Sequence, residues 1–170
     1  MAAIPSVPLF MRDVKLTLKA AADATPLEFQ CHVSEARVQV TPGDTVSVQT
    51  LCANGSFSST GKPSYALILN GYQDWDTTSN SEGLAEWLWK HEGEVCDFNL
   101  QAHGELVTAS ASKPVMLGQV VAHGVDYGGA INEYAPFEAE LACVAKPTLS
   151  TTGTMEDEPE AEPEAKRKAA

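Results

Sequence analysis

Short segments in which every second residue is apolar recur along this 170-residue sequence. In the first of them, polar residues separate four apolar ones: Leu27, Phe29, Cys31 and Val33. From Ala36 to Val40 the apolar residues fall on even positions instead, so we expect a bulge or bend near Ser34 and Glu35. A period of two is typical of strands that bury one face.

Further strands are expected at 46–51, 65–69, 96–102, 115–121 and 137–143. Residues 65–69 are apolar or aromatic without interruption, which is typical of a more fully buried strand. Gly, Pro and Asn residues punctuate the sequence between these segments. About seven or eight strands and one helix predict a mainly β protein, a sandwich or barrel with one flanking α-helix.

The predicted helix has four residues on one face: Leu84, Trp87, Leu88 and His91. Ser79 and Glu82 have the spacing of a capping box, and Gly93 is a suitable C-terminal stop. We expect Trp87 and Leu88 to anchor the helix on the sheet. Trp89, two residues from Trp87, must lie on another face, where it shields a subunit boundary or is half exposed.

Several function classes are excluded by what the sequence lacks. A formal net charge of -12 and a pI near 4.6 argue against sequence-specific DNA binding, because phosphates would be repelled. There is no basic leader and no apolar run near the ~20 residues that span a membrane, so we expect no membrane insertion and assembly in a cytoplasm. Nucleophile-elbow, P-loop and dinucleotide motifs are absent, which predicts a non-enzymatic protein without a cofactor.

No metal site is predicted either. The four histidines, His32, His91, His103 and His123, have no ligand spacing, and no C-x-x-C pair exists. Asp74 and Asp76 flank Trp75 but lack the remaining acids of a calcium loop, so a turn before the helix is the favoured interpretation. The four cysteines lie in or beside apolar stretches, which favours buried reduced thiols over disulfides: Cys31, Cys52, Cys96 and Cys143.

The composition divides the chain into three parts. Residues 1–13 form an N-terminal arm, 14–147 the β domain, and 148–170 an acidic tail that ends in Lys166-Arg167-Lys168. The tail cannot bury a core of its own, so a solvated, solubilising segment is favoured over a strap that binds a neighbouring subunit. Within the β domain, a long polar connection without periodicity follows residue 51 and is too long for a hairpin turn.

Several motifs resemble the tail tube proteins of long, flexible-tailed bacteriophages, especially those that infect actinobacteria. The similar segments are Phe-Met-Arg-Asp-Val at 10–14, Phe-Gln-Cys-His-Val-Ser at 29–34, residues 65–75, Gly-Leu-Ala-Glu-Trp-Leu-Trp at 83–89, and Tyr-Ala-Pro-Phe-Glu at 134–138. The likeness extends from about residue 14 to 146 and is one of overall pattern.

The resemblance implies a virion tail protein assembled in the host cytoplasm. Six copies would close into a ring, rings would stack into a tube, and DNA would pass through without specific binding. Its partners would be other copies, the tape measure protein, and the tail terminator and tip proteins. A negatively charged wall suits a conduit, because it repels phosphates instead of holding them.

The same resemblance assigns residues to surfaces. The polar connection would be the ring-stacking loop: Asn54, Gly55, Ser56, Phe57, Ser58, Ser59, Thr60, Gly61 and Lys62. The helix would lie near a subunit contact through Leu84, Trp87, Leu88 and Trp89. Glu138 and Glu140, which alternate with apolar residues in the last expected strand, are candidates for the lumen.

Two other classes remain open at the level of sequence. An immunoglobulin-like binding or decoration module would use a loop such as residues 54–60 to hold a partner. A small β-barrel enzyme or carrier would need polar residues that converge in one pocket, and no spacing points to such a pocket.

Overall fold

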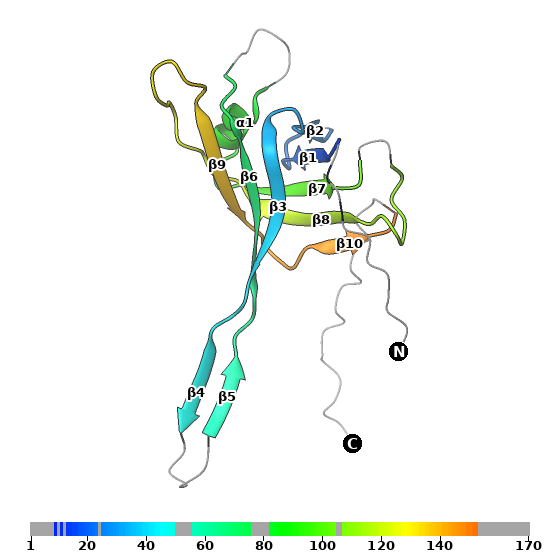
Figure 1. The fold of residues 1–170 in the computed structure, drawn as a ribbon, viewed down its shortest axis with the longest axis vertical. Helices are drawn as coiled ribbons and strands as arrows, with labels where there is room; N and C mark the ends of the chain where they lie inside the picture. Colours follow the sequence, from blue (N-terminus) through cyan, green and yellow to red (C-terminus); the bar gives the residue numbers. More distant parts are fainter. Residues whose placement is uncertain are drawn as a thin grey trace.

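The computed structural model describes residues 9, 11, 13–23, 25–49, 56–75, 82–104 and 107–152. These residues form ten strands and one helix, arranged in two antiparallel sheets and a long two-stranded arm (Figure 1). The mainly β architecture with one helix confirms the predicted fold class. No helix in the described ranges is long and apolar enough to cross a membrane.

The larger sheet has five strands in the order β10-β8-β7-β1-β2. Its strands are β1 (Lys15–Lys19), β2 (Leu27–Glu28), β7 (Val95–Gln101), β8 (Val115–Val121) and β10 (Thr148–Ser150). Strict alternation buries Leu16 and Leu18 in β1, and Cys96, Phe98 and Leu100 in β7. One face of this sheet therefore lines the core.

The smaller sheet has the order β3-β6-β9, from β3 (Val33–Thr41), β6 (Ser64–Tyr72) and β9 (Pro136–Ala142). Pairing of β3 with β6 shifts register between Val33 and Glu35, which confirms the bulge predicted there. Leu67 and Leu69 of β6 face inward and are fully buried, as are Ala139 and Leu141 of β9.

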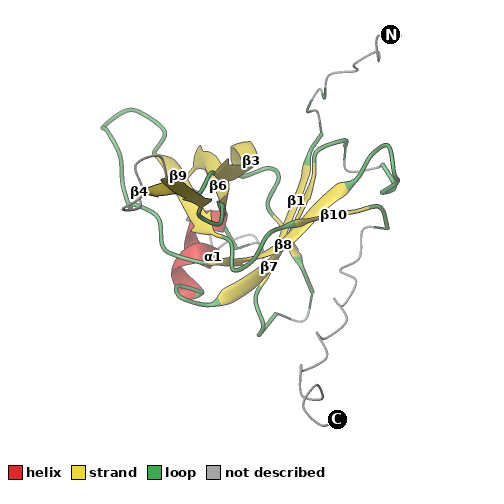
Figure 2. Cartoon of the chain, turned by 90° about the horizontal axis from the view of Figure 1, so that it is seen from below, coloured by secondary structure: helices red, strands yellow, loops and turns green. Residues whose placement is uncertain are grey.

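The two sheets pack face to face and meet at one corner (Figure 2). At that corner Val120, in β8, forms a bridge with Cys143, just after β9, and the amide of Val144 donates to the carbonyl oxygen of Gln119 at 3.0 Å. The result is a sandwich that is joined along one side, with a single core between its layers.

Helix α1 (Leu84–Lys90) lies at the end of the sandwich away from the arm (Figure 1). Its N-cap is Gly83, with no side-chain capping bond, so the predicted capping box is wrong; Ser79 lies outside the described residues. Glu82 instead pairs with Lys90. The helix ends at Lys90 with His91 as its C-cap, and the predicted stop, Gly93, follows two residues later at φ +82°, a left-handed conformation that favours glycine.

The segment 27–33 is not one strand. β2 ends at Glu28, and a turn in which the amide of His32 donates to the carbonyl of Phe29 precedes β3. The turn buries Phe29 but exposes Cys31. The expected burial of the cysteines is therefore confirmed for Cys96 and wrong for Cys31, and Cys143 is only partly buried; Cys52 lies outside the described residues. Cys31, Cys96 and Cys143 are free thiols, and burial raises the pKa of Cys96 to about 11.

Three strands were not predicted from the sequence: β1, β10, and the strand β5 (Ser56–Thr60) that is described below. β1 lies at the start of the β domain, and β10 pairs with β8 within the segment expected to be tail. Because Thr148 to Ser150 belong to the large sheet, the folded part continues past residue 147. The rest of the predicted tail from residue 153, and most of the predicted N-terminal arm, lie outside the described residues.

Candidate assembly surfaces

The arm is a β-hairpin that continues the β3–β6 pair beyond the sandwich (Figure 1). It consists of β4 (Thr45–Gln49) and β5 (Ser56–Thr60), with Val46 opposite Ser59 and Val48 opposite Phe57. The prediction of a polar connection without regular structure after residue 51, too long for a hairpin turn, is therefore wrong for 56–60, which form a strand of a hairpin. Gly61 and Lys62 form the joint with β6, and Asn54 and Gly55 lie outside the described residues.

A tight joint connects the arm to the sandwich. The amide of Gly61 donates to the carbonyl oxygen of Asp44 at 2.8 Å. A Cβ on Gly43 would lie 2.3 Å from backbone atoms of Gly61, so only glycine allows the two chain segments to approach this closely. The arm is thus attached through a close backbone contact.

The two faces of the arm differ in chemistry. Directly opposed residues of antiparallel strands share a face, so Val46, Val48 and Phe57 point to the same side. Their exposures are 61%, 59% and 74%, respectively. The other face carries Ser and Thr residues, including the cross-strand pair Ser47 and Ser58. We call Val46, Val48 and Phe57 the apolar arm face.

Helix α1 offers less external surface than predicted. Leu84, Trp87 and Leu88 are fully buried in the core, so the prediction that they contact another subunit is wrong. The expectation that Trp87 and Leu88 anchor the helix is confirmed. Trp89 is 47% exposed, and its Nε1–H donates to the carbonyl oxygen of Val125 at 2.8 Å. Of the four helix residues, Trp89 remains a candidate contact.

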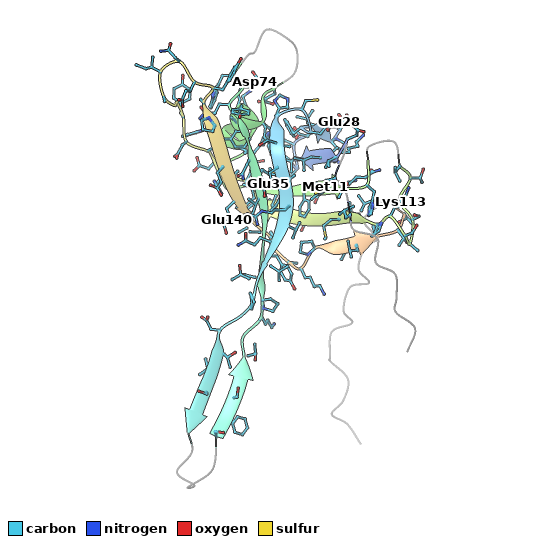
Figure 3. The ribbon with its side chains drawn as sticks, viewed as in Figure 1. Met11, Glu28, Glu35, Asp74, Lys113 and Glu140 are labelled. Atoms are coloured by element: carbon cyan, nitrogen blue, oxygen red, sulfur yellow. The ribbon has the colours of Figure 1, made fainter. Side chains whose placement is uncertain are left out.

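The small sheet carries an acidic outer face. Glu138 and Glu140 of β9 are exposed on the side away from the core, next to Asn70 and Ile68 of β6. On β3, Glu35 lies in line with Asn70, accepts a hydrogen bond from its Nδ2 at 3.0 Å, and pairs with Arg37 at 2.7 Å. Figure 3 shows Glu35 and Glu140 on the two edge strands of this sheet. Alternation therefore places both predicted lumen acids on one surface.

A group of four exposed aromatic residues and one isoleucine was missed by the sequence reasoning. It comes from the end of β6 and from the segment between β8 and β9, at the end of the molecule opposite the arm (Figures 1 and 3). Its members are Tyr72, Trp75, Tyr127, Ile131 and Tyr134, which we call the aromatic loop surface. Nothing in the sequence links residues 127–134 to Tyr72 or Trp75, so this surface could not be predicted.

Among the described residues, no cluster of three or more His, Cys, Asp or Glu side chains could hold a metal ion. Asp74 lies 3.7 Å from His32 Nδ1, and His91 Nδ1 lies 2.9 Å from Glu94. The ring nitrogens of His123 lie 3.0 Å and 2.8 Å from the carbonyl oxygens of Gly124 and Glu140. These contacts, chiefly that to Gly124, raise the pKa of His123.

No family model and no curated protein match the sequence. Solved structures match the fold: a chain in the virion of a native gene transfer agent particle, with 19% identity, covers 79% of this chain and 95% of its own length at a TM-score of 0.50. A chain from the tail of an empty gene transfer agent particle, refined with C6 symmetry, has 18% identity and a TM-score of 0.53 over 81% of this chain and 96% of that one.

A third match comes from the baseplate of the anti-feeding prophage, 6-fold symmetrised, with 10% identity, a TM-score of 0.52, and coverage of 85% of this chain and 97% of that one. The chain has a phage-tail-type β fold. At these identities the likeness concerns architecture, and each match spans nearly the whole length of the neighbour.

Proposed function

We propose that this protein is the structural subunit of the tail tube of a long, flexible-tailed phage, in which sixfold rings stack into a conduit for genome delivery. The observation that carries the proposal is the combination of a phage-tail-type fold with an arm whose apolar face projects from it. Two of the matched structures come from particles treated with sixfold symmetry. The assignment to flexible-tailed phages of actinobacteria rests on the sequence motifs.

The small sheet supports ring formation. β3 and β9 are its two edge strands, and edge strands can add the strand of a neighbour. Cyclic closure would pair these edges and create a continuous inner wall. Its lining would be the acidic face with Glu35, Glu138 and Glu140, which would repel the phosphates of passing DNA.

The arm supports stacking between rings. A two-stranded hairpin has marginal stability in water when neither of its faces is covered. A partner surface that covers the apolar arm face would therefore stabilise the arm. The strands of the arm contain no charged residue, which lets the arm approach another strongly acidic copy with little repulsion. In this account the protein acts structurally, with other copies, the tape measure protein, and terminator and tip proteins as partners in the virion tail.

A matched pair of double variants tests the arm. Val48→Ser/Phe57→Ser removes one apolar cross-strand pair, and Ser47→Ala/Ser58→Ala changes the adjacent rung on the polar face. We expect the first variant to keep the wild-type unfolding midpoint but to lose stacks in negative-stain micrographs, since each contact loses about 3–6 kcal/mol of apolar burial. The second should stack normally. Undiminished stacking by Val48→Ser/Phe57→Ser would remove the arm from the interface.

A further inference from the structure

The aromatic loop surface is unusually exposed for its composition. Tyr127, Ile131 and Tyr134 are 77%, 90% and 86% exposed, while Tyr72 and Trp75 add partly covered rings. Large contiguous apolar patches on soluble proteins mark interaction sites, and Tyr and Trp are enriched at the centres of interfaces. This surface therefore has the composition of a protein-binding site.

The surface is built by specific bonds from Gln73. Its Nε2 donates to the carbonyl oxygens of Gly128 and Pro136, both at 3.0 Å, and its Oε1 accepts from the amide of Gly128 at 3.0 Å and from Trp75 Nε1 at 3.2 Å. The backbone amide of Gln73 also donates to the carbonyl oxygen of Ala135 at 2.8 Å. One side chain thus fixes both ends of the segment, so its aromatic residues are presented in a defined arrangement.

Ring contacts add to this order. Trp75 and Tyr127 form an edge-to-face pair with centroids 5.1 Å apart, and Tyr72 and Tyr134 form a second pair at 6.0 Å. Gly128, the next residue after Tyr127, has φ +103°, a left-handed backbone conformation that favours glycine. A surface that is already ordered loses little conformational entropy on binding, which favours a docking role.

The apolar arm face is the matching surface on the same chain. It offers Val46, Val48 and Phe57, and it lies at the opposite end of the molecule (Figure 1). A contact between opposite ends of identical copies is heterologous and can repeat without closing, whereas a contact between identical ends stops at a dimer. The placement of the two surfaces therefore suits a stack that grows in one direction.

The charges of the two surfaces are also compatible. The strands of the arm are uncharged, and Lys62 and Asp44 lie at its base. The aromatic loop surface is bordered by acidic residues, namely Asp74, Asp126 and Glu133. An uncharged arm avoids like-charge repulsion from these carboxylates, and the opposite charges of Lys62 and Asp44 offset each other at its base.

On the basis of the proposed tube function, we propose that the apolar arm face of one copy docks on the aromatic loop surface of a second copy. Phe57 supplies the anchor, packed among Tyr127, Ile131 and Tyr134. A competing receiver is the apolar groove of about 590 Å³ beside the base of the arm, which is lined by Val38, Val40, Tyr65, Met116 and Leu149 among others. Because this groove lies near the arm's own end of the molecule, docking there would join copies in another orientation.

Photo-crosslinking distinguishes these contacts. In the full chain, Phe57 is replaced by p-benzoylphenylalanine, and the protein is mixed with unsubstituted ¹⁵N-labelled chain, irradiated, and mapped by mass spectrometry. The same probe at Ser58, on the polar face, is the matched control. Both sites are exposed strand positions outside the core, so neither replacement perturbs folding.

We expect crosslinks from position 57 to labelled peptides containing Trp75 or residues 127–134, in several-fold higher yield than from position 58. Crosslinks to the groove around Leu149, crosslinks from arm to arm, or no crosslink between copies would overturn the proposal. Micrographs of the same samples separate it from the tube function. If stacks form but the crosslink maps elsewhere, the docking site is wrong and the tube function stands. If the expected crosslink forms without stacks, the tube function is wrong and the docking site stands.

Discussion

At the scale of single residues, one helix presents two tryptophans with opposite roles. Trp87 is fully buried, with its ring 5.6 Å from that of Phe29, whereas Trp89 lies partly exposed over Gly124. We expect Trp87→Ala to lower the free energy of unfolding by about 3–5 kcal/mol, because a large cavity opens in the core. Trp89→Ala should cost only about 1 kcal/mol, the contribution of one hydrogen bond.

Urea unfolding followed by circular dichroism measures both changes, with the wild-type chain as reference. Equal losses from the two substitutions would contradict the assignment of Trp87 to the core and Trp89 to the surface. Loss of assembly in a fully folded Trp89→Ala protein would additionally identify Trp89 as a subunit contact.

His123 predicts a dependence of stability on pH. Two carbonyl oxygens accept from its ring nitrogens, which favours the doubly protonated imidazolium and raises the pKa of His123 above its ordinary 6.5. A raised pKa stabilises the fold fully below about pH 6.5, and this stabilisation is lost as the pH rises through the folded-state value. The difference in unfolding free energy between wild type and His123→Ala should therefore be larger at pH 6 than at pH 8.5.

Proton NMR of the His123 ring gives the folded pKa directly. A titration midpoint at or below that of an unfolded histidine, or a pH-independent difference between the two proteins, would contradict this reasoning. The neighbouring carboxylates Glu92 and Glu140 also favour the charged ring, so the difference should shrink with added salt.

At the scale of elements, burial decides which parts of the fold could be predicted from the sequence. β7 and β9 bury every second residue against one core, so their alternation predicted them to within a residue or two at either end. The shift of phase at Ser34 and Glu35 likewise predicted the bulge in β3. β5 has no such pattern, because it projects beyond the core and is ordered by pairing with β4.

The candidate surfaces divide in the same way. Glu138 and Glu140 could be placed on one face because period two is a local property. The aromatic loop surface could not be predicted, because it depends on Gln73 reaching Gly128 and Pro136, more than fifty residues away in the chain. The sequence also could not show that Leu84 is buried in the core and not in a subunit contact. An apolar helix face does not reveal which surface covers it.

At the scale of the whole molecule, the candidate surfaces lie at different ends and sides of the protein. The arm projects from one end, the aromatic loop surface lies at the other, and the edge strands β3 and β9 flank an acidic face between them. With a net charge of -12, copies repel one another except where neutral apolar surfaces meet. Assembly through the ends and edges, with the acidic face directed to a lumen, is consistent with all of these features.

Cryo-electron microscopy of the purified full chain at high concentration, with helical reconstruction of any polymer, shows whether the protein forms a tube of sixfold rings. We expect tubes of stacked sixfold rings whose inner wall is the β3-β6-β9 sheet, with Glu138 and Glu140 facing an open lumen. A compact monomer, a closed dimer, or a tube lined by the five-stranded sheet would contradict it.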